Sequence, residues 1–386
     1  MSEILNLRKF VAPEIIFGSG ARKLAGNYAS RFSARKVLIV TDSGVIAAGW
    51  LKEVAETLAE ENIPFHVFSA VSANPRSGEV MRGAREYREQ NCNLIISVGG
   101  GSPMDCAKGI GIVVSNDSHI LDFEGVDKID FPVPPLIFIP TTAGTSADVS
   151  QFAIINNEEE RVKIAIISKS VVPDVALIDP DTTYTMDSYL TACTGIDALV
   201  HAFEAYVSTG SGVLTDMYAL EAIRLINKDL PPLMNDSQNS RLRESIMLAS
   251  MKAGLAFSNA ILGAVHAMAH SLGGYLDMPH GECNAMLLEH VVNFNYSAAA
   301  SRYRHIAEAM DIRTEGLSDK IVQKELTERI VNLKKEVGIV DTLKTRGVSD
   351  SDIPVLAEKA AKDPCLITNP RNADSSELAA IYREAM

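Results

Sequence analysis

Cysteine is scarce in this 386-residue sequence and never forms a closely spaced pair. The five cysteines stand at Cys92, Cys106, Cys193, Cys283 and Cys365, an odd number without a CxxC motif. This spacing argues against a disulfide framework and against a thiolate zinc finger. We therefore expect reduced thiols, and we expect Cys283 to be a small buried hydrophobic side chain.

Long apolar runs and basic clusters are also missing. No apolar run reaches the roughly 18–20 residues that span a bilayer, and the first ten residues lack the basic-then-apolar layout of a signal peptide. The net charge is −13, and no basic cluster is longer than a few residues. Nucleic acid and anionic membranes are therefore poor partners. We expect a cytoplasmic enzyme that acts on small molecules.

The first half of the chain alternates apolar, β-branched runs with helical stretches. The runs cover residues 36–42, 63–69, 93–101, 134–145 and 175–180, and residues 152–168 read as a hairpin. The runs are apolar throughout, which is typical of strands that are covered on both faces. Their alternation with helices predicts a parallel, doubly wound sheet.

The second half has a different pattern. From about residue 183 the sequence shows long helical segments with apolar residues three and four apart, and no strand of comparable quality. A chain of this length also suggests two domains. We predict an α/β dinucleotide-binding domain at residues 1–183 and an all-helical metal-binding domain at residues 184–386.

One carboxylate and three histidines suggest a divalent-metal site in the second half. Asp197 and His201 are four residues apart, so on a helix both side chains leave the same face. His266 lies on another helical segment, and His280 follows a Gly-Gly and a Pro, where a loop can return it. Such a pair is often a capping pair, and a lone histidine is often a core group. The clustering favours Zn²⁺ or Fe²⁺, although spacing alone leaves His270 open as a ligand.

Polar and glycine-rich segments follow several predicted strands. The chain has no GxGxxG motif, and Gly18-Ser19-Gly20 reads as a turn and helix start. The segment from Gly99 to Ser102 ends a strand and opens a helix, an arrangement that presents N–H groups to a phosphate. The threonines of residues 141–145 follow the next strand, and Asp42 ends the first long one. The carboxyl ends of such strands form the ligand-binding edge.

These segments together resemble the iron-containing (group III) alcohol dehydrogenase family. The resemblance covers nearly the whole chain, through the segments FGSGA, VGGGSPMDCAK, PTTAGTSADVS, TACTGIDALVHAFEAYVS, GAVHAMAHSLGG, PHGECNA and NPR. It implies a dehydroquinate-synthase-like architecture, with an active site in the cleft between the two domains. It also implies a nicotinamide cofactor and a bound divalent metal, with Fe²⁺ first and Zn²⁺ as an alternative. We further expect NAD as the cofactor, because of Asp42, and a homo-oligomer, dimer or larger, formed through the helical half.

The resemblance also implies roles for individual residues. The metal ligands would be Asp197, His201, His266 and His280, and His270 would face the cleft without binding the metal. The cofactor would contact Asp42, Asn74, Gly100, Gly101, Ser102, Asp105, Thr141, Thr142, Thr145 and Lys163. Asp42 would accept hydrogen bonds from the ribose diol and repel a 2′-phosphate, which favours NAD over NADP.

Two positions depart from the family pattern. Asp187 stands where relatives commonly carry Pro, and we expect it to cap the following helix. Phe152 stands where relatives that reduce small hydroxyaldehydes have Asn, which makes the substrate wall more apolar. Phe257 and Cys365 are further wall candidates.

The expected reaction is hydride transfer between NAD(H) and a small primary alcohol or aldehyde of the ethanol, butanol or 1,3-propanediol type. The metal acts as a Lewis acid on the substrate oxygen, and His270 either carries the alcohol proton to solvent or only hydrogen-bonds nearby groups. Alternatives are a polyol (glycerol-type) dehydrogenase of the same fold, a metal-dependent hydrolase and a non-catalytic assembly protein.

Overall fold

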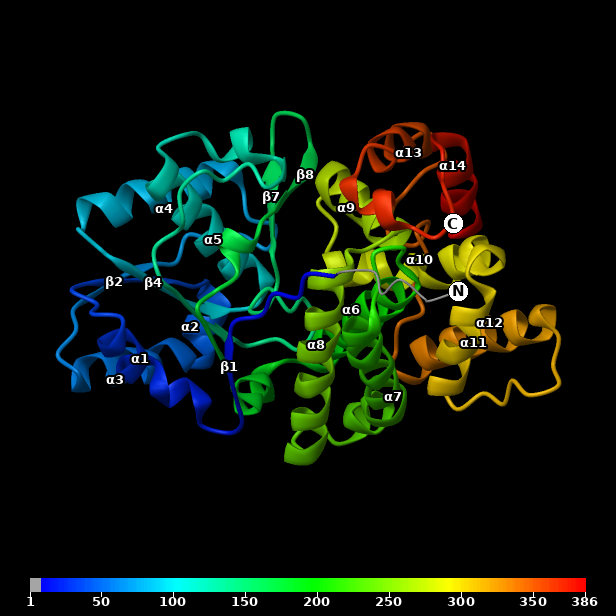
Figure 1. Cartoon of the computed structure of the whole chain (residues 1–386), viewed down its shortest axis with the longest axis horizontal. Coiled ribbons are helices and arrows are strands. Elements are labelled where there is room, and N and C mark those ends of the chain that lie inside the picture. Colours follow the sequence, from blue (N-terminus) through cyan, green and yellow to red (C-terminus); the bar gives the residue numbers. More distant parts are fainter. Residues whose placement is uncertain (1–7) are drawn as a thin grey trace, which may run out of the picture.

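A computed structural model describes residues 8–386, which form an α/β half and a helical half side by side (Figure 1). The α/β half is built on a six-stranded sheet with the order β1-β9-β6-β4-β2-β3. Its strands are β1 (Glu14–Phe17), β2 (Val37–Val40), β3 (Phe65–Phe68), β4 (Leu94–Gly99), β6 (Leu136–Pro140) and β9 (Val175–Ile178). All neighbouring strands are parallel, which confirms the prediction. Strand β1 was not predicted; it pairs with β9 from Glu14 opposite Val175.

Helices cover both faces of this sheet. They are α1 (Ala25–Arg31), α2 (Ser43–Ala48), α3 (Trp50–Glu60), α4 (Ser77–Glu89) and α5 (Gly101–Asn116), with 3-10 turns η1 (Ala21–Leu24), η2 (Ile120–Phe123), η3 (Lys169–Val171) and η4 (Pro180–Thr185). Successive residues of one strand point to opposite faces. Accordingly, Ile39 of β2 shares an apolar cluster with Leu58 of α3, and Leu38 shares one with Ile110 of α5. The inner strands β2, β4, β6 and β9 are fully buried for this reason, as their apolar runs predicted, whereas the edge strands β1 and β3 are partly exposed.

A second sheet joins the α/β half to the helical half. Strands β7 (Phe152–Asn157) and β8 (Val162–Ile167) form the predicted antiparallel hairpin, and β5 (Gly125–Val126) pairs with β8. The hairpin lies against α9 (Ala264–Leu276). A methyl group at Gly274 would lie 2.7 Å from the backbone nitrogen of Lys163, and Arg161 donates to the carbonyl of Tyr275 at 2.6 Å.

The remainder of the chain is helical. The other helices are α6 (Ser188–Val207), α7 (Val213–Asn235), α8 (Ser240–Ala260), α10 (His280–Asn295), α11 (Ala300–Ala309), α12 (Asp319–Glu336), α13 (Ile353–Ala360) and α14 (Ser375–Glu384), with η5 (Tyr296–Ala298) and η6 (Pro364–Thr368). Residues 184–386 contain no strand, as predicted. Asp187 accepts a hydrogen bond from Leu190 N at 2.7 Å and so caps α6, as expected.

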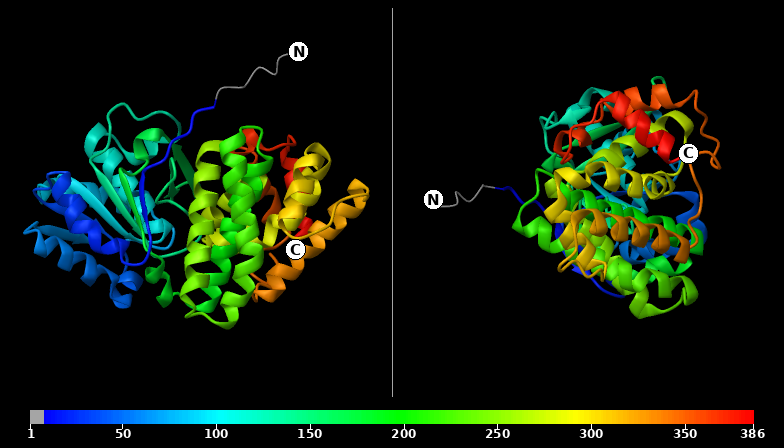
Figure 2. Two further views of the ribbon diagram at one scale, coloured as in Figure 1. Left: turned by 60° about the horizontal axis from the view of Figure 1, so that its bottom comes forward. Right: turned by 90° about the vertical axis from the view of Figure 1, so that its right-hand side faces the viewer.

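Helix α6 is the central element of this half. Almost all of its residues from Thr191 onward are buried, and it contacts α7, α8 and α10. The long helices α7 and α8 stand side by side against it (Figures 1 and 2). No single helix of residues 8–386 is both long and apolar enough to cross a membrane; α8 and α9 meet that test only as a pair, bent by 100°.

Candidate metal centre and cofactor cleft

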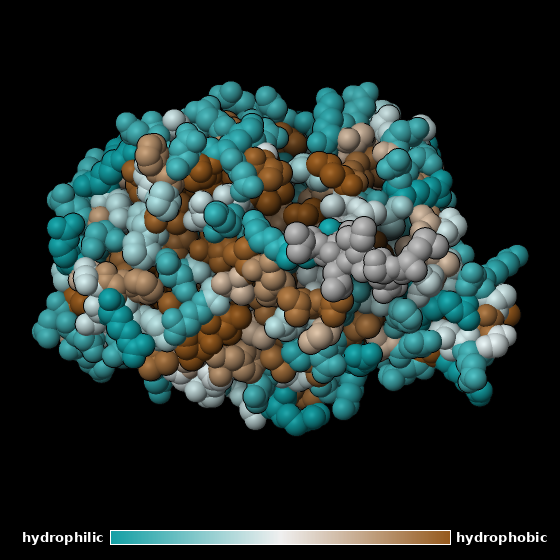
Figure 3. Space-filling view, in the orientation of Figure 1, coloured by the Kyte–Doolittle hydropathy of each residue, from teal (hydrophilic) through white to brown (hydrophobic). Residues whose placement is uncertain are grey.

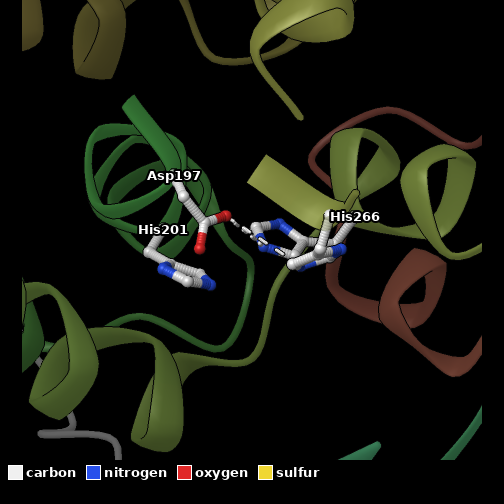
Figure 4. Close-up of side chains that lie close together, drawn as sticks. Asp197, His201 and His266 are labelled. Carbon is white, nitrogen blue, oxygen red and sulfur yellow. Dashed lines mark ion pairs between the residues drawn. The ribbon is translucent and has the colours of Figure 1, made fainter. Parts of the chain in front are cut away.

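The four predicted metal ligands come together from three helices. Asp197 and His201 lie one turn apart on α6 and point toward His266, near the start of α9 (Figure 4). The expected loop returns His280 to the same place, where it is the first residue of α10. One ligand atom from each of the four residues lies within 4.8 Å of the others. The Nε2 atoms of His266 and His280 are 4.0 and 3.9 Å from Asp197 Oδ1.

Burial gives these histidines the protonation state that a metal requires. Burial lowers the pKa of His201 to about 4 and that of His266 to about 3, and it lowers the pKa of His280 well below its usual value. All three are therefore neutral at pH 7, and neutral imidazole is the form that binds a metal ion. Within residues 8–386, the buried Nδ1 atoms of His201 and His280 also have no hydrogen-bond partner. The donor set fits Fe²⁺ or Zn²⁺.

Two residues that the sequence analysis missed contact these ligands. Glu204, on α6, lies 2.6 Å from Nδ1 of His266 through its Oε2. The Asn284 amide nitrogen, on α10, donates to Asp197 Oδ1 at 2.5 Å and lies 3.2 Å from His266 Nε2. Such partners orient ligands and are a usual part of metal sites.

His270 has a buried acidic partner that was also missed. Its Nδ1 lies 2.8 Å from Oδ2 of Asp363, and its ring stacks on that of His280 with centroids 5.4 Å apart. Burial disfavours the charged carboxyl, but His270 beside it keeps the pKa of Asp363 below its usual value. His270 lines the cleft, as expected. Cys365 is fully buried and is absent from the cleft wall, so the prediction that it lines the substrate site is wrong.

A single cleft of about 1020 Å³ joins the metal ligands to the glycine-rich loop. Every predicted cofactor residue lines it: Asp42, Asn74, Gly100, Gly101, Ser102, Asp105, Thr141, Thr142, Thr145 and Lys163. The cleft therefore has room for a dinucleotide whose one end reaches the metal ligands.

The glycine-rich loop and the threonine loop lie in contact. A methyl group at Gly101 would be 2.9 Å from Thr145 Cγ2, and one at Gly100 would be 3.2 Å from Thr142 Cγ2. Gly100 is the N-cap of α5 without a side-chain hydrogen bond, which leaves backbone N–H groups at the helix start for an anion. The loop also meets the helical half, because a methyl group at Gly144 would be 2.6 Å from Thr194 Cβ on α6.

Three of the predicted cofactor residues already have partners within the protein. Asp42 caps α2 by accepting from Val45 N at 2.9 Å. The Ser102 hydroxyl donates to the carbonyl of residue 73 at 2.5 Å, and the Asn74 amide donates to Asp277 at 2.6 Å. Asp277 ends α9, so this last bond joins the two halves at the edge of the cleft.

Ionisable side chains lie both in the cleft wall and beneath it. Burial raises the pKa of Asp105 to about 7 and lowers the pKa of Lys163. Lys108, which the sequence analysis did not assign, is fully buried, and burial lowers its pKa to about 8. Its ammonium group donates to the Ser150 carbonyl at 2.9 Å, the Ser150 hydroxyl at 3.2 Å and the Phe152 carbonyl at 2.7 Å. Lys108 thereby fixes two residues of the cleft wall.

The wall beside the metal ligands is apolar and aromatic. The rings of Phe152 and Phe257 have centroids 5.6 Å apart, and Phe257 stacks on His201 at 4.3 Å. Both phenylalanines are buried and line the cleft, as predicted, and Ile154 and Leu262 line it with them.

Comparison with known proteins identifies the family. The model described as "Iron-containing alcohol dehydrogenase" matches residues 12–180, and that described as "Fe-containing alcohol dehydrogenase family, C-terminal" matches residues 191–386. The chain is 38% identical to the 1,3-propanediol dehydrogenase of Klebsiella pneumoniae over 379 residues, covering 97% of this chain and 98% of that protein. It is 36% identical to the NAD-dependent methanol dehydrogenase of Bacillus methanolicus, covering 98% and 99%.

Comparison with solved structures supports the same family. The crystal structure of a 1,3-propanediol oxidoreductase matches with a TM-score of 0.95 at 38% identity, over 99% of this chain and 100% of that one. The family models cover both halves of the chain, and these relatives are aligned over nearly their full lengths. The chain therefore belongs to the iron-containing alcohol dehydrogenase family.

Proposed function

We propose that this enzyme transfers a hydride between NAD(H) and small primary alcohols or aldehydes at a divalent metal ion. The observation that carries this proposal is that one cleft is lined by both the four metal-ligand candidates and the glycine-rich start of α5. Similarity to dehydrogenases named for 1,3-propanediol and methanol supports it. A hydrolase would not need the glycine-rich helix start, which argues against that function. A polyol dehydrogenase of the same fold remains the alternative.

The metal would be held by Asp197, His201, His266 and His280. When bound, Fe²⁺ or Zn²⁺ supplies a Lewis acid that lowers the pKa of an alcohol. We place Fe²⁺ first because of the family. The neutral state of the three imidazoles at pH 7 supports the assignment, because the site needs no deprotonation before it accepts an ion.

The cofactor would lie across the carboxyl edge of the sheet. The N–H groups at the start of α5 (Gly100, Gly101 and Ser102) would hold the pyrophosphate, and Asp42 would accept from the ribose diol and select NAD. The nicotinamide end would lie near Asp105, with Asn74, Thr141, Thr142, Thr145 and Lys163 along the remaining length. The position of all these residues on one cleft wall supports this path.

His270 is our candidate for carrying the alcohol proton between substrate and solvent. Asp363 accepts from its Nδ1 at 2.8 Å, which leaves Nε2 as the ring nitrogen available to the cleft. The paired carboxylate holds the ring in one orientation, as partners of catalytic histidines commonly do. If Nε2 only hydrogen-bonds a neighbouring ligand or water, His270 is a positioning residue instead.

The substrate would be a small primary alcohol of the ethanol, butanol or 1,3-propanediol type, without a hydroxyl on the carbon next to the reacting one. Phe152, Phe257, Ile154 and Leu262 offer no hydrogen bond to a second hydroxyl near the reacting carbon. A buried hydroxyl without a partner costs about 1–3 kcal/mol, which disfavours 1,2-diols and hydroxyaldehydes relative to alkyl alcohols.

Three broader expectations are also retained as proposals: the domain boundary at residue 183, a cytoplasmic location and a homo-oligomer. Figure 3 shows hydrophobic residues gathered over the middle of one face of the molecule. Val213, Leu214 and Met217, at the start of α7, are 75%, 50% and 60% exposed. Exposed apolar groups of this size are typical of contact surfaces, which supports self-association.

The test is anaerobic NADH oxidation with short aldehydes, hydroxyaldehydes and dihydroxyacetone, using protein stripped of metal and reloaded with Fe²⁺ or Zn²⁺. Turnover should depend on the metal, be lost in His266→Ala and persist in His305→Ala. His305 is a suitable control because it pairs with Tyr206 at 2.7 Å and does not line the cleft.

The outcomes separate the parts of the proposal. Turnover mainly with dihydroxyacetone would favour the polyol dehydrogenase. NADH binding without turnover under any metal would contradict the proposed substrate class. Failure to bind NADH would overturn the dehydrogenase reading of this chain.

A further inference from the structure

Glu204 is a buried carboxylate at the junction of two helices, and neither the proposed ligand set nor the cofactor path uses it. It is 4% exposed and lies on α6, three residues after His201 and seven after Asp197, so helical spacing places it on the same face. It accepts hydrogen bonds from Gly263 N at 3.1 Å and Val265 N at 2.6 Å, and its Oε2 lies 2.6 Å from His266 Nδ1.

Two of these bonds cap the start of α9. The first N–H groups of a helix have no partner within the helix, and Gly263, the N-cap of α9, has no side chain to supply one. Glu204 supplies the acceptor from a different helix, and its negative charge also suits a helix N-terminus. A methyl group at Gly263 would lie 2.9 Å from Glu204 Oε1, so glycine there permits the approach.

The third bond determines how His266 faces the metal site. Burial raises the pKa of Glu204 to about 7, while the N–H groups of Val265 and Gly263 beside it favour the ionised form. The ionised carboxylate only accepts hydrogen bonds, so in that form Nδ1 of His266 carries the proton. In a neutral imidazole the other nitrogen then has the free lone pair. That nitrogen, Nε2, is the one 4.0 Å from Asp197 Oδ1. The carboxylate therefore selects the tautomer that a metal ion needs.

We propose that Glu204 is a positioning residue with two linked effects: it caps the start of α9, and it fixes the tautomer of His266 on that helix. Metal affinity should therefore depend on the Glu204 carboxylate. The inference rests on the proposed metal site and adds a residue outside the ligand set. A simple helix-capping role would also explain two of the three bonds. The experiment must therefore separate capping from the contact with His266.

The chain contains a matched control for capping. Asn369 Oδ1 accepts from Ala264 N at 3.1 Å, so it caps the same helix start, and none of its hydrogen bonds reaches a proposed ligand. Asn369→Ala removes a cap and leaves His266 with Glu204. Glu204→Gln keeps the shape of the side chain, but it forces an amide N–H toward Gly263 N, Val265 N or His266 Nδ1, which are all donors.

The measurement is the dissociation constant of Zn²⁺, by chelator competition with the metal-stripped full-length protein, together with the visible spectrum of the Co²⁺ form. Glu204→Gln should weaken Zn²⁺ binding by about 10–100-fold, the usual effect of removing such a partner, and should change the Co²⁺ spectrum. Asn369→Ala should lower the melting temperature but leave the dissociation constant within about threefold of wild type, because it touches no ligand. Gly263→Ala keeps both side chains but displaces both, because its methyl group would lie 2.8 Å from Asn369 Oδ1 and 2.9 Å from Glu204 Oε1. It should weaken Zn²⁺ binding in the direction of Glu204→Gln and by more than Asn369→Ala does.

Contrary results are equally clear. Equal affinity of wild type and Glu204→Gln would overturn the inference, as would equal weakening by Asn369→Ala. If wild type itself binds no more tightly than His266→Ala, the proposed metal site fails first. If Glu204→Gln does not fold, Gly263→Ala and Asn369→Ala decide the question between them.

Discussion

Replacing Lys108 with methionine should destabilise the protein strongly, although Lys108 lies outside the proposed chemistry. Its ammonium group is fully buried and donates to three acceptors, two of them backbone carbonyls at 2.9 and 2.7 Å. Methionine fills a similar volume but offers no donor. The variant loses three charge-assisted hydrogen bonds, which stabilise the protein by about 1.5–3 kcal/mol each. It also avoids the desolvation cost of burying the ammonium group, which offsets part of that loss. The net loss should be about 3–5 kcal/mol, because methionine leaves two buried carbonyl oxygens and the Ser150 hydroxyl without their donor, at about 1–3 kcal/mol each.

The expected change in melting temperature follows from chain length. Unfolding entropy is about 2.1 cal/mol/K per residue, so 386 residues give about 0.8 kcal/mol/K. A loss of 3–5 kcal/mol then lowers the melting temperature by about 4–6 °C. The assay is thermal unfolding at pH 7, where Lys108, with its pKa lowered to about 8 by burial, is still mostly protonated.

A surface lysine provides the control for this prediction. Lys52 is 82% exposed in its side chain and pairs with Glu56 at 3.8 Å, so Lys52→Met should change stability by less than about 0.5 kcal/mol. A Lys108→Met melting temperature within about 1 °C of wild type would refute the reasoning. It would mean that the cost of burying the ammonium group cancels its three hydrogen bonds.

Other predictions test pH dependence and specificity. Burial raises the pKa of Asp148 from 3.8 to about 6, so the native state holds this proton more tightly and loses about 3 kcal/mol of stability as pH rises from 3.8 through 6. In urea unfolding, Asp148→Asn should therefore be more stable than wild type at pH 8 but not at pH 4; an equal difference at both would contradict the assignment. Phe152→Asn should raise kcat/KM for lactaldehyde relative to propanal by about tenfold or more, because it supplies a hydrogen-bond partner for the second hydroxyl; an unchanged ratio would remove Phe152 from the substrate wall. Asp42→Ser keeps a capping oxygen for α2 and removes the charge, so KM for NADPH should fall by about tenfold relative to that for NADH; no change would show that Asp42 does not select the cofactor.

The fold was predictable because its signals are local. Each inner strand of the parallel sheet is an apolar run bounded by polar or glycine residues, and all observed strands except β1 and β5 fall inside the predicted ranges. Strand β1 was missed because its four residues, Glu14–Phe17, follow no helix within residues 8–13 and pair only with β9, some 160 residues later. Pairing over that distance leaves no periodic signal in the sequence.

The site was predictable in part for the same reason. Helical spacing indicated Asp197 and His201, but only family resemblance separated His280 from His270 as the fourth ligand. Glu204 and Asp363 were missed because their roles depend on contacts with His266 and His270, which lie 62 and 93 residues away in the sequence. Glu204 did offer a weak signal, since it repeats the helical spacing of the two ligands before it.

The docking of the β7–β8 hairpin on α9 has a consequence for how the molecule opens. The helix that carries His266 and His270 touches backbone of the α/β half at Gly274, so neither half can melt without exposing the other. We expect a single cooperative transition, in which the amide hydrogens of β8 and α9 exchange with solvent with one common free energy of opening. Slow exchange with the same protection across these two elements would show that the hairpin couples the unfolding of the nucleotide site to that of the metal site.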